Sequence, residues 1–221
     1  MQRVITGIEQ QKRNRNRVNL YLDEEFAFGL HKYTALGLKV GDVLSEEQIR
    51  QLQKEDAVEE AYQRSLKLLG FRARSEHEIR TRLSQYDCDE EVIEQVIVRL
   101  TEKGYVNDQR FAEEWVENRT TFRPRGRKLL KLELQQKNLD EEQIESAMND
   151  LPDEEEMARN AARKYSARLR GLDEQTFKKK LYGFLVRRGF QYEDFKVIME
   201  ELWEESNPSN LLEKEVKNDE W

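Results

Sequence analysis

Two stretches of the sequence carry an excess of positive charge that could bind an acidic protein surface or a phosphate. Residues 119–131 hold six basic side chains and no acidic one, and residues 159–180 hold eight against two. Guanidinium and ammonium groups bind carboxylates and phosphates through charge-assisted hydrogen bonds. These stretches therefore predict positions that contact a partner protein or DNA. The candidates are Arg119, Arg123, Arg125, Arg127, Lys128, Lys131, Arg163, Lys164, Arg168, Arg170, Lys178, Lys179 and Lys180.

The spacing of these residues predicts a shared basic face. Arg123, Arg127 and Lys131 recur every four residues, and Arg125 lies in the approach. Lys178 follows Arg127 by 51 residues, the repeat spacing described below, which favours a continuous stripe. The alternative is a solvated helix surface with intrahelical ion pairs. Since the first stretch contains no acid, pairing within it cannot neutralise it.

A third candidate precedes the helix predicted after residue 75. Arg72 and Arg74 either contact a partner or form a connection whose charges face water, and both interpretations remain open. Ser75 and Glu78 are spaced as a capping box, in which the serine and glutamate side chains bind backbone N–H groups at the helix start. We expect those two residues to cap the helix.

The sequence offers little for catalysis. His31 and His77 are the only histidines and Cys88 is the only cysteine, so no metal cluster or Cys–His pair is predicted. It contains no phosphate-binding loop, glycine-rich dinucleotide fingerprint or serine elbow. We expect a non-enzymatic protein with no catalytic residues, no metal and no cofactor.

Aromatic side chains could stack on nucleic acid bases. Their positions in amphipathic segments predict that most belong to the core instead. The residues considered are Tyr62, Phe71, Tyr86, Trp115, Phe122, Tyr165, Phe177 and Phe184.

Composition limits the class of protein. Charged residues make up 38% of the 221, well above the usual share of about 25%, which indicates much solvated helix surface. The net charge of −7 argues against a protein that coats nucleic acid. No apolar run reaches the length of a membrane span, and a single cysteine fits a reducing compartment. We expect a cytoplasmic monomer without a membrane partner.

The first 56 residues read as a small β-rich unit followed by a short helix. Residues 4–10, 17–23 and 25–30 alternate apolar and polar side chains, and the short connection at 23–25 predicts a hairpin. Ser45 and Gln48 are spaced as a capping box.

The rest of the chain repeats a helical pattern every 51 residues. Six positions are apolar in all three copies, and the last four of them fall on one helix face. With an amphipathic run before each pair, every copy predicts three helices. The equivalent residues are Ile79, Leu130 and Leu181; Leu83, Leu134 and Leu185; Ile93, Ile144 and Phe195; Val96, Ala147 and Ile198; Ile97, Met148 and Met199; and Leu100, Leu151 and Leu202.

The joint between the first two copies is the segment GYVNDQRFAEEW. Gly104 is predicted as the residue after a helix end, and Asn107 or Asp108 as the cap of the next helix. Phe111 and Trp115, four residues apart, are predicted core residues.

The expected fold is mostly α, with three tandem three-helix modules in an elongated, curved array and a small β-rich N-terminal unit. The expected divisions are 1–56, 57–104, 105–152, 153–203 and an acidic, disordered tail at 204–221.

Three segments resemble the signature of the RecX family, bacterial regulators of the RecA recombinase. They are RARSEHEIRTRL (72–83), LTEKGYVNDQRFA (100–112) and RPRGRKLLKLEL (123–134). The joint with Gly104, Tyr105, Asn107, Asp108, Phe111 and Ala112 is the most specific element. The third copy matches more weakly, since it lacks the Arg-Ser-x-x-Glu start.

The resemblance implies a protein that binds the RecA filament on DNA and inhibits its recombinase, ATPase and co-protease activities. We also expect weak binding to single- or double-stranded DNA. The alternatives are a direct DNA-binding, winged-helix-like module and a helical scaffold for another partner.

Overall fold

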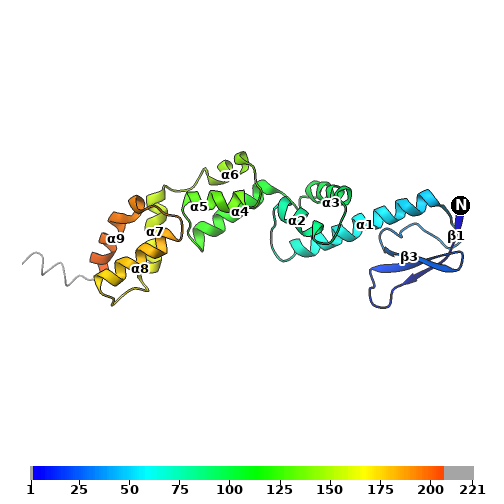
Figure 1. The fold of residues 1–221 in the computed structure, drawn as a ribbon, viewed down its shortest axis with the longest axis horizontal. Coiled ribbons are helices and arrows are strands. Elements are labelled where there is room, and N and C mark those ends of the chain that lie inside the picture. Colours follow the sequence, from blue (N-terminus) through cyan, green and yellow to red (C-terminus); the bar gives the residue numbers. More distant parts are fainter. Residues whose placement is uncertain (1, 207–221) are drawn as a thin grey trace, which may run out of the picture. The chain divides into compact units, whose positions relative to one another are not determined.

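The computed structural model describes residues 2–206 of the chain, which form four strands and nine helices (Figure 1). The described residues fall into two compact units that divide between Asn107 and Asp108. The acidic tail predicted from residue 204 begins inside the last helix, which continues to Ser206, and residues 207–221 lie outside the described residues.

The first unit begins with an antiparallel sheet of order β3-β2-β1-β4. The predicted hairpin is present, with Leu22 opposite Glu25 and a positive φ at both Asp23 and Glu24. The fourth strand was not predicted because it is only three residues long. The strands are β1 (Gln2–Gln10), β2 (Arg17–Leu22), β3 (Glu25–His31) and β4 (Val43–Ser45).

One long helix joins this sheet to the first three-helix module. Helix α1 (Glu46–Leu69) begins at the predicted capping box of Ser45 and Gln48. It runs without interruption through residues 56 and 57, where the sequence predicted a division. Its first turns pack Ile49 and Leu52 against the sheet core, and its later turns supply Ala61 to the core of the module.

The helices of the three modules follow the predicted repeat. Glu90, Glu141 and Tyr192 begin the third helix of the successive modules at intervals of 51 residues. Besides α1, the helices are α2 (Glu76–Ser84), α3 (Glu90–Glu102), α4 (Asp108–Thr121), α5 (Arg127–Gln135), α6 (Glu141–Met148), α7 (Glu154–Ser166), α8 (Glu174–Val186) and α9 (Tyr192–Ser206).

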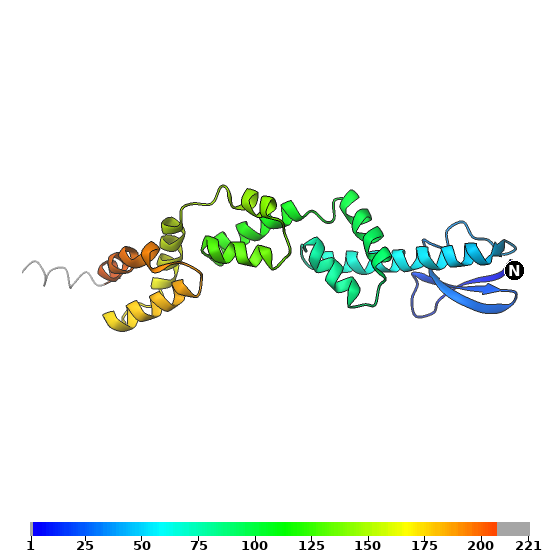
Figure 2. The same ribbon diagram turned by 45° about the horizontal axis from the view of Figure 1, so that its top comes forward.

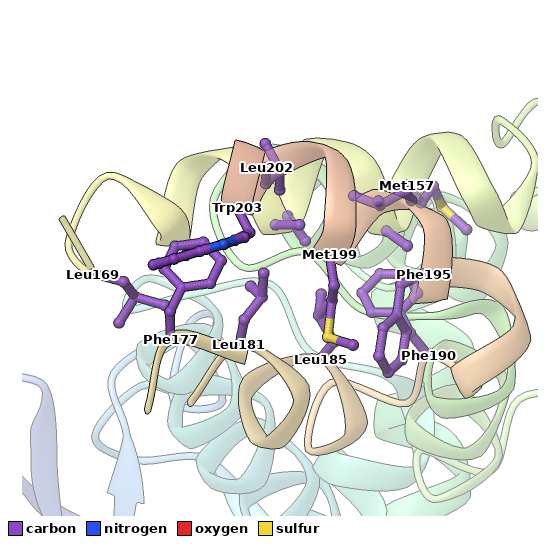
Figure 3. Close-up of a cluster of buried hydrophobic side chains, with 14 residues drawn as sticks. Met157, Leu169, Phe177, Leu181, Leu185, Phe190, Phe195, Met199, Leu202 and Trp203 are labelled. Carbon is purple, nitrogen blue, oxygen red and sulfur yellow. The ribbon is translucent and has the colours of Figure 1, made fainter. Parts of the chain in front are cut away.

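Each module has its own apolar core, built from the repeated positions. All of them are buried except Ala147 and Leu151, which are half-buried. In the third module, α7, α8 and α9 pack against one another (Figure 2). Figure 3 shows Phe177 of α8 against Trp203 of α9, with the two ring centroids 5.4 Å apart. The expected mostly helical fold with a small β unit is confirmed.

The joint after the first module ends one helix as predicted. The Tyr105 N–H donates to the Leu100 carbonyl and the Gly104 N–H to that of Thr101, both at 2.9 Å, with Gly104 at a φ of +70°. These two bonds form a Schellman motif. Because α4 begins at Asp108, Asn107 directly precedes it.

The residues that follow the joint belong to the core of the second module. Phe111 and Ala112 are buried, as predicted. Trp115 is half-buried against the same core and donates from its indole N–H to Glu133 at 2.9 Å.

Candidate partner-binding surface

The arginines of the first module lie in the loop between α1 and α2 and have partners in the fold. Arg72 donates from both terminal nitrogens to the two carboxylate oxygens of Glu78, each at 2.9 Å. These hydrogen bonds raise the pKa of the Arg72 guanidinium. Arg74 donates to the Leu68 carbonyl at 3.3 Å, and Ser75 accepts from the Glu78 N–H as an N-cap. The charge of Arg72 is therefore neutralised locally.

In the second module, acids from outside the basic stretch pair with part of it. The Glu133 carboxylate accepts from Arg119 at 2.7 Å and lies 3.4 Å from the Nε of Arg125. Lys131 pairs with Glu141. Pairing within the stretch is impossible, as the sequence indicates, but the fold brings in carboxylates from later positions.

The predicted basic helix face is not formed, and this is a correction. Helix α5 begins at Arg127, so Arg123 lies in the loop before it and cannot share a face with Arg127 and Lys131. The proline between Arg123 and Arg125 restricts the residue before it to extended conformations, which accounts for the loop.

Arg127 is bound to the backbone of its own unit. Its guanidinium donates to the carbonyls of Leu151 at 2.6 Å and Pro152 at 3.0 Å. These groups lie in the connection between α6 and α7, so Arg127 ties the second module to the start of the third. We assign it a structural role rather than a contact with a partner.

Most basic residues of the second stretch, 159–180, that lie on helices also have partners within the fold. Lys178 pairs with Glu174 at 2.7 Å and with Glu200. Arg163 lies 3.6 Å from Glu205. The two positions that the repeat aligned, Arg127 and Lys178, thus both have partners inside the fold and do not form a stripe of free charge.

The remaining candidates have free charges. Lys164 donates to the Thr121 carbonyl at 3.2 Å, which leaves its charge without a carboxylate among the described residues. Within residues 2–206, six further side chains are exposed and make no hydrogen bond or ion pair with one another or with the rest. These are Arg123, Lys128, Arg168, Arg170, Lys179 and Lys180.

One arginine that sequence reasoning missed, Arg188, lies against the loop of Arg123 and Arg125. Its guanidinium donates to the Pro124 carbonyl at 3.0 Å, and its own carbonyl accepts from the Gly126 N–H at 2.8 Å. Burial, and then the charges of Arg125 and Arg123, lower the pKa of Arg188. No sequence signal pointed to it, because it lies 64 positions from Pro124.

The same loop is held by a close contact with the third module. Helix α5 has Gly126 as its N-cap, which has no side chain to bind the first N–H groups. Glu154 of α7 supplies this cap, since both its oxygens accept from the Arg127 N–H at 3.1 Å. Burial raises the pKa of Glu154. A Cβ on Gly126 would lie 2.6 Å from the carbonyl oxygen of Gly189, so the two backbones can approach this closely only because residue 126 is glycine.

Two aromatic residues are more exposed than the sequence predicted. Phe71 is 86% exposed and Phe122 is 75% exposed, and each directly precedes one of the loop arginines, Arg72 or Arg123. Most of the eight aromatic candidates lie in or against a core, as expected, but these two and Tyr86 do not. Of the other aromatic candidates, Tyr62 and Phe177 are buried, Trp115, Tyr165 and Phe184 are half-buried, and Tyr86 is exposed.

The described residues show no metal site and no membrane-spanning helix. Among them, no three side chains of the types His, Cys, Asp and Glu are grouped so that they could hold a metal ion. None of their helices combines the length and apolar character needed to cross a bilayer.

Four family models match successive parts of the chain. Residues 3–45 match the regulatory protein RecX N-terminal domain. Residues 61–100, 107–148 and 153–199 match the RecX first, second and third three-helix domains.

Individual proteins give the same result. The chain is 35% identical to regulatory protein RecX of Halalkalibacterium halodurans over 160 residues, which cover 70% of this chain and 60% of that protein. It is 30% identical to regulatory protein RecX of Clostridium botulinum (strain Alaska E43), covering 89% of this chain and 95% of that protein. A crystal structure of regulatory protein RecX superimposes with a TM-score of 0.67 at 28% identity, covering 90% of this chain and 99% of that one.

Proposed function

Because this chain belongs to the RecX family, we propose that it binds the filament that the RecA recombinase forms on DNA and inhibits it. The inhibited activities are strand exchange, ATP hydrolysis and co-protease action, so the protein regulates DNA repair and recombination. It acts in the cytoplasm as a monomer and needs no cofactor or catalytic residue of its own.

The repeated module is the observation that carries this proposal. The first two modules place the sequence Phe-Arg-x-Arg, at residues 71–74 and 122–125, in the same loop between their first and second helices. A filament presents the same protomer surface at regular intervals. A chain that repeats a three-helix module can contact successive protomers, and each contact raises the effective concentration for the next.

Inhibition of ATP hydrolysis tests the proposal. The full chain is titrated into its cognate recombinase on single-stranded DNA, and ATP turnover is followed at ratios well below one chain per recombinase protomer. The expected result is inhibition at amounts too small to cover the DNA. Turnover that stays unchanged, or falls only when the free DNA is saturated with this protein, would refute regulation of the filament.

Direct DNA binding is the second candidate function, and the free arginine in the loop of residues 122–125 favours it. It cannot use a winged helix, because all strands among the described residues lie before residue 46 and each module is helical. The two candidates differ in salt dependence. A protein held by six phosphates should lose affinity with a log–log slope of about −4 on single strands.

A further inference from the structure

Loop 122–125 and the end of α8 bring three arginines together. Arg188 donates to the carbonyl of Pro124, the residue between Arg123 and Arg125. The backbone bond from Gly126 to Arg188 fixes the two segments against each other. The fold therefore holds the backbones of the three arginines close together, and it fixes the guanidinium of Arg188.

The carboxylates near this group do not balance its charge. Glu133 is shared between Arg119 and Arg125, and it lies on the side of Trp115. The Nε of Arg125 is buried and has no hydrogen-bond partner among the described residues. Glu154 faces the backbone N–H of Arg127 instead of a guanidinium.

The remaining guanidinium groups lack an acid altogether. Arg123 has no polar partner among the described residues, and Arg188 bonds only to a carbonyl and lies 4.3 Å from the ring centre of Phe184. The positive charges of neighbouring guanidinium groups repel one another, and each disfavours the charged form of the next. An anionic group would relieve this repulsion.

The first module shows what a neutralised version of this loop looks like. Arg72 and Arg123 occupy equivalent places in the repeat, and so do Glu78 and Leu129. In the first module Glu78 binds Arg72 through both oxygens. In the second module Leu129 contacts the backbone region of Gly189 and can offer no acceptor.

Aromatic surface borders the arginines. Phe122 directly precedes Arg123 and exposes 75% of its surface. Phe184, beneath Arg188, stacks on Tyr165 with the ring centroids 3.9 Å apart. Lys164 adds a positive charge beside the same loop through its bond to the Thr121 carbonyl. Arginines next to an exposed aromatic ring are typical of surfaces that bind unpaired nucleotides.

We propose that Arg123, Arg125 and Arg188 bind a phosphate of single-stranded nucleic acid and that Phe122 stacks on an adjacent unpaired base. Guanidinium groups match phosphate oxygens through paired hydrogen bonds. An acidic protein surface would also satisfy the charges, but a nucleotide supplies a phosphate for the arginines and a base for the ring in one ligand. The site rests on the second candidate function, direct DNA binding, and deepens it by assigning the residues and the single-stranded form of nucleic acid that they bind.

Fluorescence anisotropy of the full chain with a labelled oligothymidylate tests this site without any recombinase. The test variants are Arg123→Ala, the double variant Arg123→Ala with Arg188→Ala, and Phe122→Ala. Arg125 is left intact because its Nε is buried beside Glu133. The matched controls are Arg72→Ala and Phe71→Ala, which change the equivalent loop of the first module. Circular dichroism checks that each variant is folded.

The double variant should bind the single strand on the order of tenfold more weakly, because it loses two charge-assisted contacts. Arg123→Ala alone, which removes an exposed side chain without internal contacts, should show a smaller loss in the same direction. Phe122→Ala should bind the single strand about fivefold more weakly and a duplex of the same length no more weakly than wild type. The two controls should stay within about twofold of wild type, since Arg72 is already paired.

Three outcomes would overturn the site. One is wild-type affinity in the folded Arg123→Ala and double variants. The second is displacement of the oligonucleotide by inorganic phosphate at equal charge concentration, which would mean a simple anion site. The third is a double variant that keeps its DNA affinity but no longer inhibits the recombinase, which would assign the arginines to a protein partner. If wild type does not bind the oligonucleotide yet inhibits ATP turnover, the site fails and the proposed function stands.

Discussion

The loops at residues 71–74 and 122–125 have nearly the same sequence and the same place in their modules, but they differ in how much charge they leave free. In the first loop Arg72 binds Glu78 with both terminal nitrogens. In the second loop Arg123 has no partner among the described residues, and Arg188 adds a further positive charge. The difference at one equivalent position, Glu78 against Leu129, accounts for the paired Arg72 and the unpaired Arg123.

The two loops also differ in how their helices are capped. Ser75 caps α2 with its own side chain. Gly126 cannot cap α5, and Glu154 from the next module does so instead. The first loop is therefore complete within its module, whereas the second requires the third module. A repeated sequence does not guarantee a repeated role, because neighbouring segments decide which charges are satisfied.

The second loop depends on the third module, and substitution of Gly189 should disturb this dependence most. Gly189→Ala places a Cβ 2.6 Å from that of Leu129 at a φ of +87°. We expect a loss of about 2–4 kcal/mol in the stability of the second unit, from overpacking together with backbone strain. Urea unfolding followed by tryptophan fluorescence measures it, since all three tryptophans follow residue 107.

Gly171→Ala is the matched control, since Gly171 has a φ of +81° but open space around its Cβ position. It should cost only the backbone contribution, about 1 kcal/mol. Equal losses in the two variants would show that the contact with Leu129 is unimportant.

Removal of the cap from the third module should have the next largest effect. Glu154→Ala leaves the Arg127 N–H without its acceptor and should destabilise the second unit by about 1–2 kcal/mol. Glu154→Gln keeps an oxygen in place and should cost less than half as much. The same urea titration measures the loss of stability in both variants. If Gln proves as damaging as Ala, the negative charge and not the cap is what holds the joint.

Removal of the carboxylate that pairs with Arg72 should leave the first loop with a free charge, as in the second loop. Glu78→Gln removes the carboxylate that binds Arg72, so single-stranded DNA should bind roughly threefold to tenfold more tightly. Glu76→Gln is the control, because it changes the net charge equally but affects the pair with Arg80. If both variants gain affinity to the same degree, only net charge matters and the pairing of Arg72 has no role.

A change of pH should alter the stability of the first unit through His31, and this effect should be smaller than those above. His31 is buried beside Glu59 and Asp56 in the first unit, and burial lowers its pKa despite these carboxylates. His31 therefore binds a proton more readily in the unfolded chain than in the folded chain. The stability contributed by His31 is present above its ordinary pKa of about 6.5 and is lost as the pH falls through that range.

Amide hydrogen exchange in α1 should therefore become faster, relative to the intrinsic rate, between about pH 7.5 and 5.5. His31→Gln should flatten this dependence, whereas substitution of His77, which is exposed, should leave it unchanged. A dependence that persists in His31→Gln would mean that another group is responsible.

Much of the fold could be predicted because it rests on periodic apolar residues. The positions of Ile79, Leu130 and Leu181 follow from the repeat, and all three are fully buried. The capping signal at Ser45 likewise acts locally and forms the expected bonds. The short strand β4 carried too few residues for a pattern. The continuity of α1 was missed because its residues face the sheet first and a helical core later.

The charged surface could be predicted only in outline. The basic residues were visible, but their partners are distant in sequence: Glu141 pairs with Lys131, and Arg188 lies against Pro124. Composition counts charges without stating which of them pair. The exposure of Phe122 could not be inferred either, because a loop and a helix can carry the same aromatic residue.

The most direct test compares the salt dependence of single-stranded DNA binding for two full-length variants, Arg72→Ala and Arg123→Ala. A residue that binds a phosphate contributes about 0.7 to the log–log slope on a single strand. We predict that Arg123→Ala lowers the slope by about this amount and that Arg72→Ala leaves it unchanged. If the two substitutions alter the slope equally, the loops do not differ in free charge and the assignment of the phosphate site to the second loop is contradicted.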